Sequence, residues 1–468
     1  MYDSPKMAQY LLKSAFLESG WSRNALVMVG HDGMIQSIAP EQPERQAPDV
    51  EVVPGIVVPG MPNAHSHAFQ RAMAGDTEYR LSARDSFWTW RQSMYALANR
   101  IEPDDLQLIA LQVFVEMLKA GYTSVAEFHY LHNRRDGSAY ASDNPLWEAV
   151  RAAASQAGIG LTLLPTLYQT SDFGAQPLRA DQARFHHATD DFLRAVESQL
   201  PARRGSAAQL QRTGAAFHSL RAVPLENLGH AARHLRALDA SLPLHIHVAE
   251  QVLEVDACVR ETGARPIELL LRTGLLDAHW CLVHATHATP HEIKAMAATG
   301  VTVCVSITTE ANLGDGFFDA LRFLKNDGRL CIGSDSQSSV NPAEELRWLE
   351  YQQRLRRRKR GVLASNNESH IGTALWRAAA LAGASALGQP AGTLAVGRRA
   401  DWLVLDPAHP ALAGGSLDTS LDRLLFAGGD RAIRDVMVGG RWAVRDGRHA
   451  QDEHLRGRFG ALLARLGS

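Results

Sequence analysis

Short apolar runs recur along the chain between about residues 57 and 340, and helix-like segments separate them. Continuous apolar runs that alternate with helices are typical of a parallel sheet covered on both faces. Eight such units predict an α/β fold, a (β/α)8 TIM barrel. The expected strands are Ile56–Asn63, Tyr122–Tyr130, Ile159–Tyr168, Ala215–Val223, Leu244–Glu250, Trp280–His287, Val301–Thr309 and Leu330–Gln337.

Polar residues gather at the carboxyl end of nearly every expected strand. In a parallel barrel these ends meet at one mouth, so residues that are far apart in the sequence would share one site. The residues concerned are His65, His67, Glu127 to Tyr130, His218, Arg221, His247, Glu250, His284, Glu310 and Asp335.

The two flanks of the chain contain shorter strand candidates around turns. Gly439-Gly440 between two alternating segments is a hairpin signal. Because each flank is too short to bury a core alone, we expect residues 1–57 and 395–468 to combine into one small β-sandwich domain. Residues 58–394 would then form the barrel, with the Ala-rich segment His370–Leu387 as its last helix.

The overall charge and the ends of the chain bear on its partners and location. The formal net charge of −2 gives no reason to expect nucleic acid or an anionic membrane. The basic run Arg356–Arg360 follows a helix-like segment and is interpreted as a solvated helix face. The sequence shows neither a targeting pattern at residue 1 nor a membrane-spanning run, and its four cysteines lack paired spacing. We therefore expect a cytoplasmic protein without disulfides that acts on a small molecule.

His65 and His67 are the strongest chemical signal. On a strand, residues i and i+2 point to the same face, so both side chains can bind one metal ion. An isolated His-x-His pair is more often a pair of polar edge residues. Here, however, later expected strands end in further candidate groups, which are His247 with Glu250 three residues later, then His284, then Asp335. The ordered set predicts a metal-dependent hydrolase.

This set resembles the amidohydrolase superfamily, whose fold is a distorted (β/α)8 barrel with a small β-sandwich built from both chain ends. The resemblance implies that Glu250 shuttles protons and that His284 is an electrophile beside a metal ion. The implied ligands of one divalent metal ion are His65, His67, His247 and Asp335. Members with two metal ions usually carry a lysine at the end of the fourth strand, and the segment Gly214–Arg221 has none. One metal ion per chain, zinc by expectation, is therefore favoured.

Two longer motifs, Pro62–Arg71 and Thr308–Gly316, are similar to the formimidoylglutamate deiminases of histidine degradation. In that family the substrate is held through its glutamate carboxylates. The positions that match its binding residues are Gln70, Arg91, Tyr130, His218 and Arg221. The resemblance implies hydrolysis of N-formimino-L-glutamate to N-formyl-L-glutamate and ammonia, and a homodimer is the expected assembly.

The residues suit this chemistry. A bound divalent metal ion makes water nucleophilic at neutral pH. Asp335 can accept a proton from that water, Glu250 can carry a proton to the leaving nitrogen, and His284 can stabilise charge in the tetrahedral intermediate.

Two other functions stay open. A deaminase of a purine, pyrimidine or pterin ring needs the same catalytic set, and only Arg91 and Arg221 favour a carboxylate substrate over aromatic pocket walls. A non-catalytic scaffold on the same fold is disfavoured because every expected ligand is retained. The segment Thr170–Asp191 is long enough for a mobile loop over the mouth, and an ordinary surface insertion explains it equally well.

Overall fold

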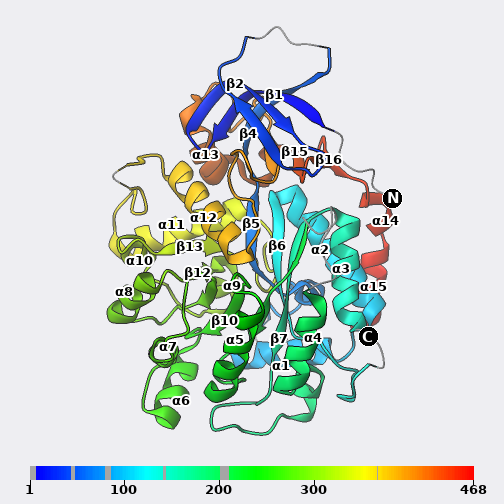
Figure 1. The fold of residues 1–468 in the computed structure, drawn as a ribbon, viewed down its shortest axis with the longest axis vertical. Helices are drawn as coiled ribbons and strands as arrows, with labels where there is room; N and C mark the ends of the chain where they lie inside the picture. Colours follow the sequence, from blue (N-terminus) through cyan, green and yellow to red (C-terminus); the bar gives the residue numbers. More distant parts are fainter. Residues whose placement is uncertain are drawn as a thin grey trace.

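The computed structural model describes residues 7–43, 48–79, 86–140, 144–200, 210–365 and 367–467. It consists of a parallel barrel and a smaller sheet, which lies above the barrel in Figure 1. All eight expected barrel strands are present, which confirms the predicted α/β fold. They are β5 (Met61–Ser66), β6 (Tyr122–His129), β7 (Gly160–Leu167), β9 (Ala215–Phe217), β10 (Leu244–Val248), β11 (Trp280–His284), β12 (Thr302–Val305) and β13 (Arg329–Ile332). A short strand, β8 (Gln211–Thr213), also pairs with β7.

Hydrogen bonds between the first and last barrel strands close the ring. The backbone amides of Ser334 and Asp335 both donate to the carbonyl oxygen of His65, at 3.0 Å each. Beneath them, the Asn63 side chain donates to Ser334 Oγ at 2.7 Å. Closure therefore brings the His65–His67 segment directly beside Asp335.

The observed strands are shorter than the expected runs, and the first and fourth strands show why. The segment Ile56–Asn63 spans two strands, because β4 (Val50–Pro59) belongs to the small sheet and β5 begins at Met61. The strand is interrupted at Gly60. Only glycine fits there, because a Cβ atom would lie 2.2 Å from the side chain of Thr123. The fourth strand ends at Phe217, and the following residues form a turn in which Ser219 O accepts the amide of Val223.

Helices surround the barrel, and five of them begin with proline at the first helical position, where its missing amide costs no hydrogen bond. The helices up to the last barrel strand are α1 (Phe87–Ala98), α2 (Pro103–Ala120), α3 (Pro145–Ala157), α4 (Thr189–Gln199), α5 (Leu225–Leu238), α6 (Val252–Thr262), α7 (Pro266–Arg272), α8 (Pro290–Thr299), α9 (Ile307–Leu313) and α10 (Ala320–Leu324). Two long helices follow, α11 (Pro342–Arg357) and α12 (Ile371–Leu387), and the second is the predicted Ala-rich helix.

The small sheet contains strands from both ends of the chain. Its order is β17-β16-β15-β14-β4-β1-β2-β3, and β4 continues directly into the first barrel strand. Ile35 of β3 also donates to Arg398 O at 2.8 Å, so the sheet curls back on the segment before β14 and encloses its own apolar core. Its further strands are β1 (Ala8–Leu17), β2 (Gly20–Val29), β3 (Ile35–Ala39), β14 (Trp402–Leu405), β15 (Ile433–Val438), β16 (Arg441–Arg445) and β17 (Arg448–His449). The predicted hairpin at Gly439-Gly440 joins β15 to β16, whereas the exact domain boundaries stay a prediction.

The last helices return to the barrel. Short α13 (Ser420–Arg423) precedes β15, and α14 (Asp452–Leu455) and α15 (Arg458–Gly467) lie beside α2, as Figure 1 shows. Lys119 of α2 pairs with Asp452 at 2.5 Å, and Arg100 donates to Leu466 O at 2.6 Å. No helix in the described ranges combines the length and the apolar character that crossing a membrane requires.

The insertion at residues 170–191 is anchored in its second half. Gln182 donates to the hydroxyl of Tyr168 at 2.8 Å, and the buried guanidinium of Arg184 donates to Ala98 O at 2.5 Å. Phe185 is fully buried against Tyr168. These contacts tie the insertion to the barrel near α1.

Candidate active site

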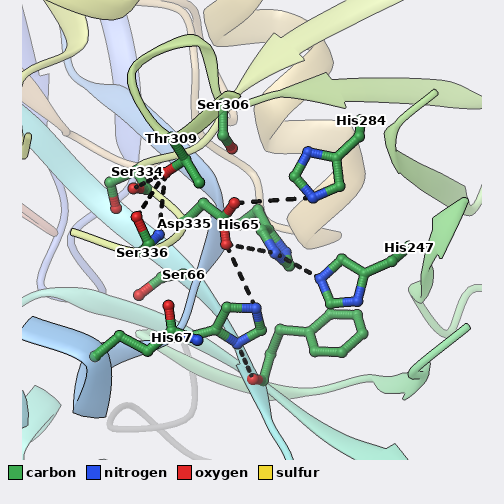
Figure 2. A network of polar contacts seen from close by, with 12 residues as sticks. His65, Ser66, His67, His247, His284, Ser306, Thr309, Ser334, Asp335 and Ser336 are labelled. Carbon is green, nitrogen blue, oxygen red and sulfur yellow. Dashed lines mark hydrogen bonds and ion pairs between the residues drawn. The ribbon is translucent and has the colours of Figure 1, made fainter. Parts of the chain in front are cut away.

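Four predicted metal ligands meet at the mouth of the barrel, as Figure 2 shows. His65 Nε2 lies 3.3 Å from Asp335 Oδ1 and 3.0 Å from His247 Nε2. His67 Nε2 lies 3.5 Å from the same oxygen of Asp335. All four side chains are buried. His65 lies in β5 and His247 in β10, His67 directly follows β5, and Asp335 lies in the loop after β13.

The protonation of these rings suits a metal ion. His67 Nδ1 lies 2.8 Å from Phe128 O, and His247 Nδ1 lies 2.9 Å from His218 O. A ring nitrogen that faces a carbonyl oxygen must carry the proton, so each Nε2 presents a lone pair. Burial lowers the pKa of His67 to about 3 and also lowers the pKa of His247, which keeps both rings neutral. Lone pairs and a carboxylate oxygen thus converge, and the residues fit a divalent cation.

The backbone is strained where three strands reach this site. Ala249, His284 and Asp335 have φ values of 51°, 70° and 50°, in the left-handed region that residues with a side chain rarely adopt. Such a conformation costs about 1–3 kcal/mol per residue, so surrounding contacts must hold it. Glu254 accepts the amides of Ala249 and Glu250 at 3.1 and 3.0 Å.

Glu250 and His284 lie next to the predicted ligands. His284 Nε2 is 3.7 Å from Glu250 Oε1 and 3.8 Å from Asp335 Oδ2. Burial raises the pKa of Glu250 to about 7. Burial alone would lower the pKa of His284, but Glu250 and Glu310 raise it well above 6.5. Burial alone would raise the pKa of Asp335, but His65 and His284 lower it. The site therefore pairs a cationic imidazole with a carboxyl group that exchanges protons near neutral pH.

A pocket above these residues is lined by every predicted site residue except His65, which lies beneath it. Arg91 projects from α1 and Arg221 from the turn after β9. Arg91 Nη1 and the Nε and Nη1 atoms of Arg221 are buried without a hydrogen-bond partner in the described part of the chain. Burial and the nearby charge of Arg221 lower the pKa of Arg91, whereas Tyr168 and Glu254 raise the pKa of Arg221 against the effect of burial. Their unpartnered N–H groups are of the kind that binds carboxylates.

The other three predicted binding residues offer neutral groups. Gln70 Nε2 donates to the hydroxyl of Tyr130 at 3.1 Å, and Gln70 Oε1 is buried without a partner among the described residues. Burial and the charge of Arg221 lower the pKa of His218 well below its ordinary value. The pocket therefore supplies hydrogen bonds beside the two cations.

The sequence analysis missed Trp88. Its ring centroid lies 4.3 Å from Arg91 Cζ and 5.6 Å from Arg221 Cζ, so one indole contacts both cations. The signal was the i, i+3 spacing of Trp88 and Arg91, which places both on one face of a helix. Three aromatic side chains of the same helix line the pocket itself, so arginines and aromatic walls occur together. These are Phe87, Trp90 and Tyr95.

Comparisons with known proteins agree with this geometry. Residues 56–443 match the model of the amidohydrolase family. The chain is 49% identical to a formimidoylglutamate deiminase of Pseudomonas aeruginosa over 98% of this chain and all of that protein. It is 29% identical to an 8-oxoguanine deaminase of the same organism over 90% of each chain.

Solved structures show the same fold. An amidohydrolase from Brucella melitensis superposes with a TM-score of 0.90 at 40% identity, covering 98% of this chain and all of the other. An adenosine deaminase from Xanthomonas campestris, solved with bound zinc, superposes over both whole chains with a TM-score of 0.80 at 21% identity. The family match and the near-complete overlap with these relatives show that the chain belongs to the amidohydrolase family.

Proposed function

We propose that the chain is a zinc-dependent formimidoylglutamate deiminase, which converts N-formimino-L-glutamate and water to N-formyl-L-glutamate and ammonia. The observation that carries the proposal is a pair of arginines with buried, unpartnered N–H groups, which line the same pocket as His67, His247 and Asp335. A substrate with two carboxylates supplies hydrogen-bond acceptors for these donors. The Pseudomonas aeruginosa relative, 49% identical over its whole length, is a formimidoylglutamate deiminase.

Substrate binding is assigned to the residues away from the metal ligands. Arg91 and Arg221 bind the glutamate carboxylates, because a planar guanidinium donates two parallel hydrogen bonds to a carboxylate. Gln70, Tyr130 and His218 bind the remaining polar atoms and direct the formimino carbon toward Glu250. This division of the pocket places the reacting carbon next to the proton-carrying groups.

The reaction replaces nitrogen by oxygen at one carbon. A bound divalent metal ion supplies Lewis acidity and makes water nucleophilic at neutral pH. Asp335 accepts a proton as the C–O bond forms, and Glu250, whose pKa is raised to about 7 by burial, delivers a proton to the leaving nitrogen. His284 lies within 4 Å of both carboxyl groups and stabilises the negative charge of the tetrahedral intermediate. The C–N bond then breaks and ammonia leaves.

The metal is proposed to be a single zinc ion. Three imidazoles and one carboxylate are typical zinc donors. The end of the fourth strand offers no lysine that could bridge a second ion. The homodimer and the cytoplasmic location stay predictions.

A ring deaminase is the second candidate, because aromatic side chains line the pocket and an 8-oxoguanine deaminase is 29% identical. A substrate screen with ammonia detection separates the two. We expect ammonia and N-formyl-L-glutamate in equal amounts from N-formimino-L-glutamate, and no turnover of adenine, guanine, 8-oxoguanine or cytosine compounds. Formamide and glutamate as products, or robust turnover of a purine, would overturn the proposal.

A further inference from the structure

We infer that Glu310 is a positioning residue that orients the ring of His284, an inference that rests on the proposed deaminase function. Glu310 lies in the first turn of α9, after β12, and its side chain is fully buried. Its Oε1 atom lies 3.2 Å from His284 Nδ1 and accepts the amide of Ser306 at 3.1 Å. No other residue in the described ranges is hydrogen-bonded to a ring nitrogen of His284.

The contact decides which way the ring points. Because Glu310 accepts the Nδ1 proton, Nε2 is left to face Glu250 and Asp335, at 3.7 and 3.8 Å. The left-handed backbone of His284, at φ 70°, removes the regular strand geometry that would otherwise set its direction. A buried carboxylate that accepts the Nδ1 proton is therefore the partner that holds the ring plane of His284.

Helix α9 connects this contact to the other side of the site. Thr309, next to Glu310, accepts the amide of Ser336 at 3.2 Å, and their hydroxyl groups lie 3.0 Å apart. Ser336 follows Asp335 in the chain. The first turn of α9 thus contacts both the imidazole of His284 and the loop that carries Asp335, and it fixes the position of one group relative to the other.

A purely structural role is the competing explanation, because Glu310 also accepts the amide of Ser306. Glu345 of α11 provides a matched control. It is a second fully buried carboxyl group that contacts the same turn, through the amide of Thr308 at 3.2 Å and the Thr308 hydroxyl. It has no hydrogen bond or ion pair with His284 in the described ranges. Burial raises the pKa of Glu345 to about 8, so glutamine replaces a largely neutral group there.

The first measurement compares the purified variants Glu310→Gln and Glu345→Gln with the wild type, with N-formimino-L-glutamate as substrate. We expect E310Q to retain its metal and to keep KM within about threefold, while kcat falls about 10- to 100-fold, the usual effect of removing a group that orients a catalytic histidine. We expect E345Q to keep kcat within about threefold. Unchanged kcat in E310Q, or equal losses in both variants, would overturn the inference.

The second measurement does not depend on activity. In protein with 15N-labelled histidine, the Nδ1 proton of His284 should give a downfield resonance, assigned by its loss in His284→Asn. This resonance should move upfield in E310Q and stay in place in E345Q; its absence from the wild type, or an unchanged position in E310Q, would overturn the inference. If the resonance behaves as expected and the wild type does not hydrolyse N-formimino-L-glutamate, the proposed function fails and the positioning role stands.

Discussion

Glu250 Oε1 and His284 Nε2 lie 3.7 Å apart, although the two residues follow different strands of the barrel. This pair joins a carboxyl group, whose pKa burial raises to about 7, to an imidazole that stays positively charged at neutral pH. One group can therefore exchange a proton while the other stabilises negative charge.

Replacing Glu250 with glutamine should preserve the fold and the metal content but lower kcat about 10²- to 10⁴-fold, the usual contribution of a positioned acid–base group. The amide has nearly the same shape and cannot exchange the proton. Steady-state kinetics with metal analysis of the same sample checks this. Near-wild-type turnover on N-formimino-L-glutamate would assign Glu250 a structural role.

The wild-type protein should hold one metal ion per chain, and His247→Ala should lose most of it. The substitution removes one imidazole donor and leaves the other three ligands to hold the ion alone, which weakens the site. Elemental analysis after dialysis against metal-free buffer measures the ratio. Two ions retained per chain and both needed for activity would contradict the single-metal proposal.

The substitution Arg221→Lys should lower kcat/KM about 10- to 100-fold without loss of metal. Lysine keeps the charge but cannot donate two parallel hydrogen bonds to a carboxylate. A hydrogen bond to a charged group contributes about 1.5–3 kcal/mol, which corresponds to this range of rates. Kinetics on N-formimino-L-glutamate checks the effect, and an unchanged kcat/KM would remove Arg221 from the carboxylate site.

Trp88→Leu should raise KM about 3- to 30-fold with little change in kcat. A cation–π contact contributes about 0.5–2 kcal/mol, and here one indole contacts both arginines. Trp348→Leu, on α11 and 42% exposed, is the matched control and should leave KM unchanged. Equal effects of the two substitutions would argue against a role for Trp88 in substrate binding.

The pH dependence of stability should change in Glu345→Gln. Burial raises the pKa of Glu345 from 4.5 to about 8, so between these values the folded state binds more protons than the unfolded state. Its contribution to the free energy of unfolding is therefore fully present below about pH 4.5 and is lost as the pH rises through 8. Urea unfolding at pH 5 and pH 8 should show that E345Q loses less stability than the wild type over this interval. A larger loss in E345Q would contradict the sign.

Local patterns in the sequence were sufficient for the fold and for the polar residues at the strand ends, among which the family resemblance selected the predicted metal ligands. The eight apolar runs predicted the barrel strands because alternation with helices is a property of neighbouring residues. The spacing of His65 and His67 placed both on one face of a strand for the same reason. The interruption between β4 and β5 at Gly60 could not be predicted in this way, because it depends on the approach of Thr123 from the next strand.

Only the tertiary structure decided which groups touch across the mouth of the barrel. Closure of the ring by the amides of Ser334 and Asp335 on His65 O sets the spacing of the predicted ligands. The contact between Glu310 and His284, and the place of Trp88 beside Arg91 and Arg221, depend on how distant turns pack. By itself the sequence determined which side chains stand at the strand ends, since that order is local. Their distances, tautomers and pKa shifts arise from barrel closure and burial, which involve residues hundreds of positions apart.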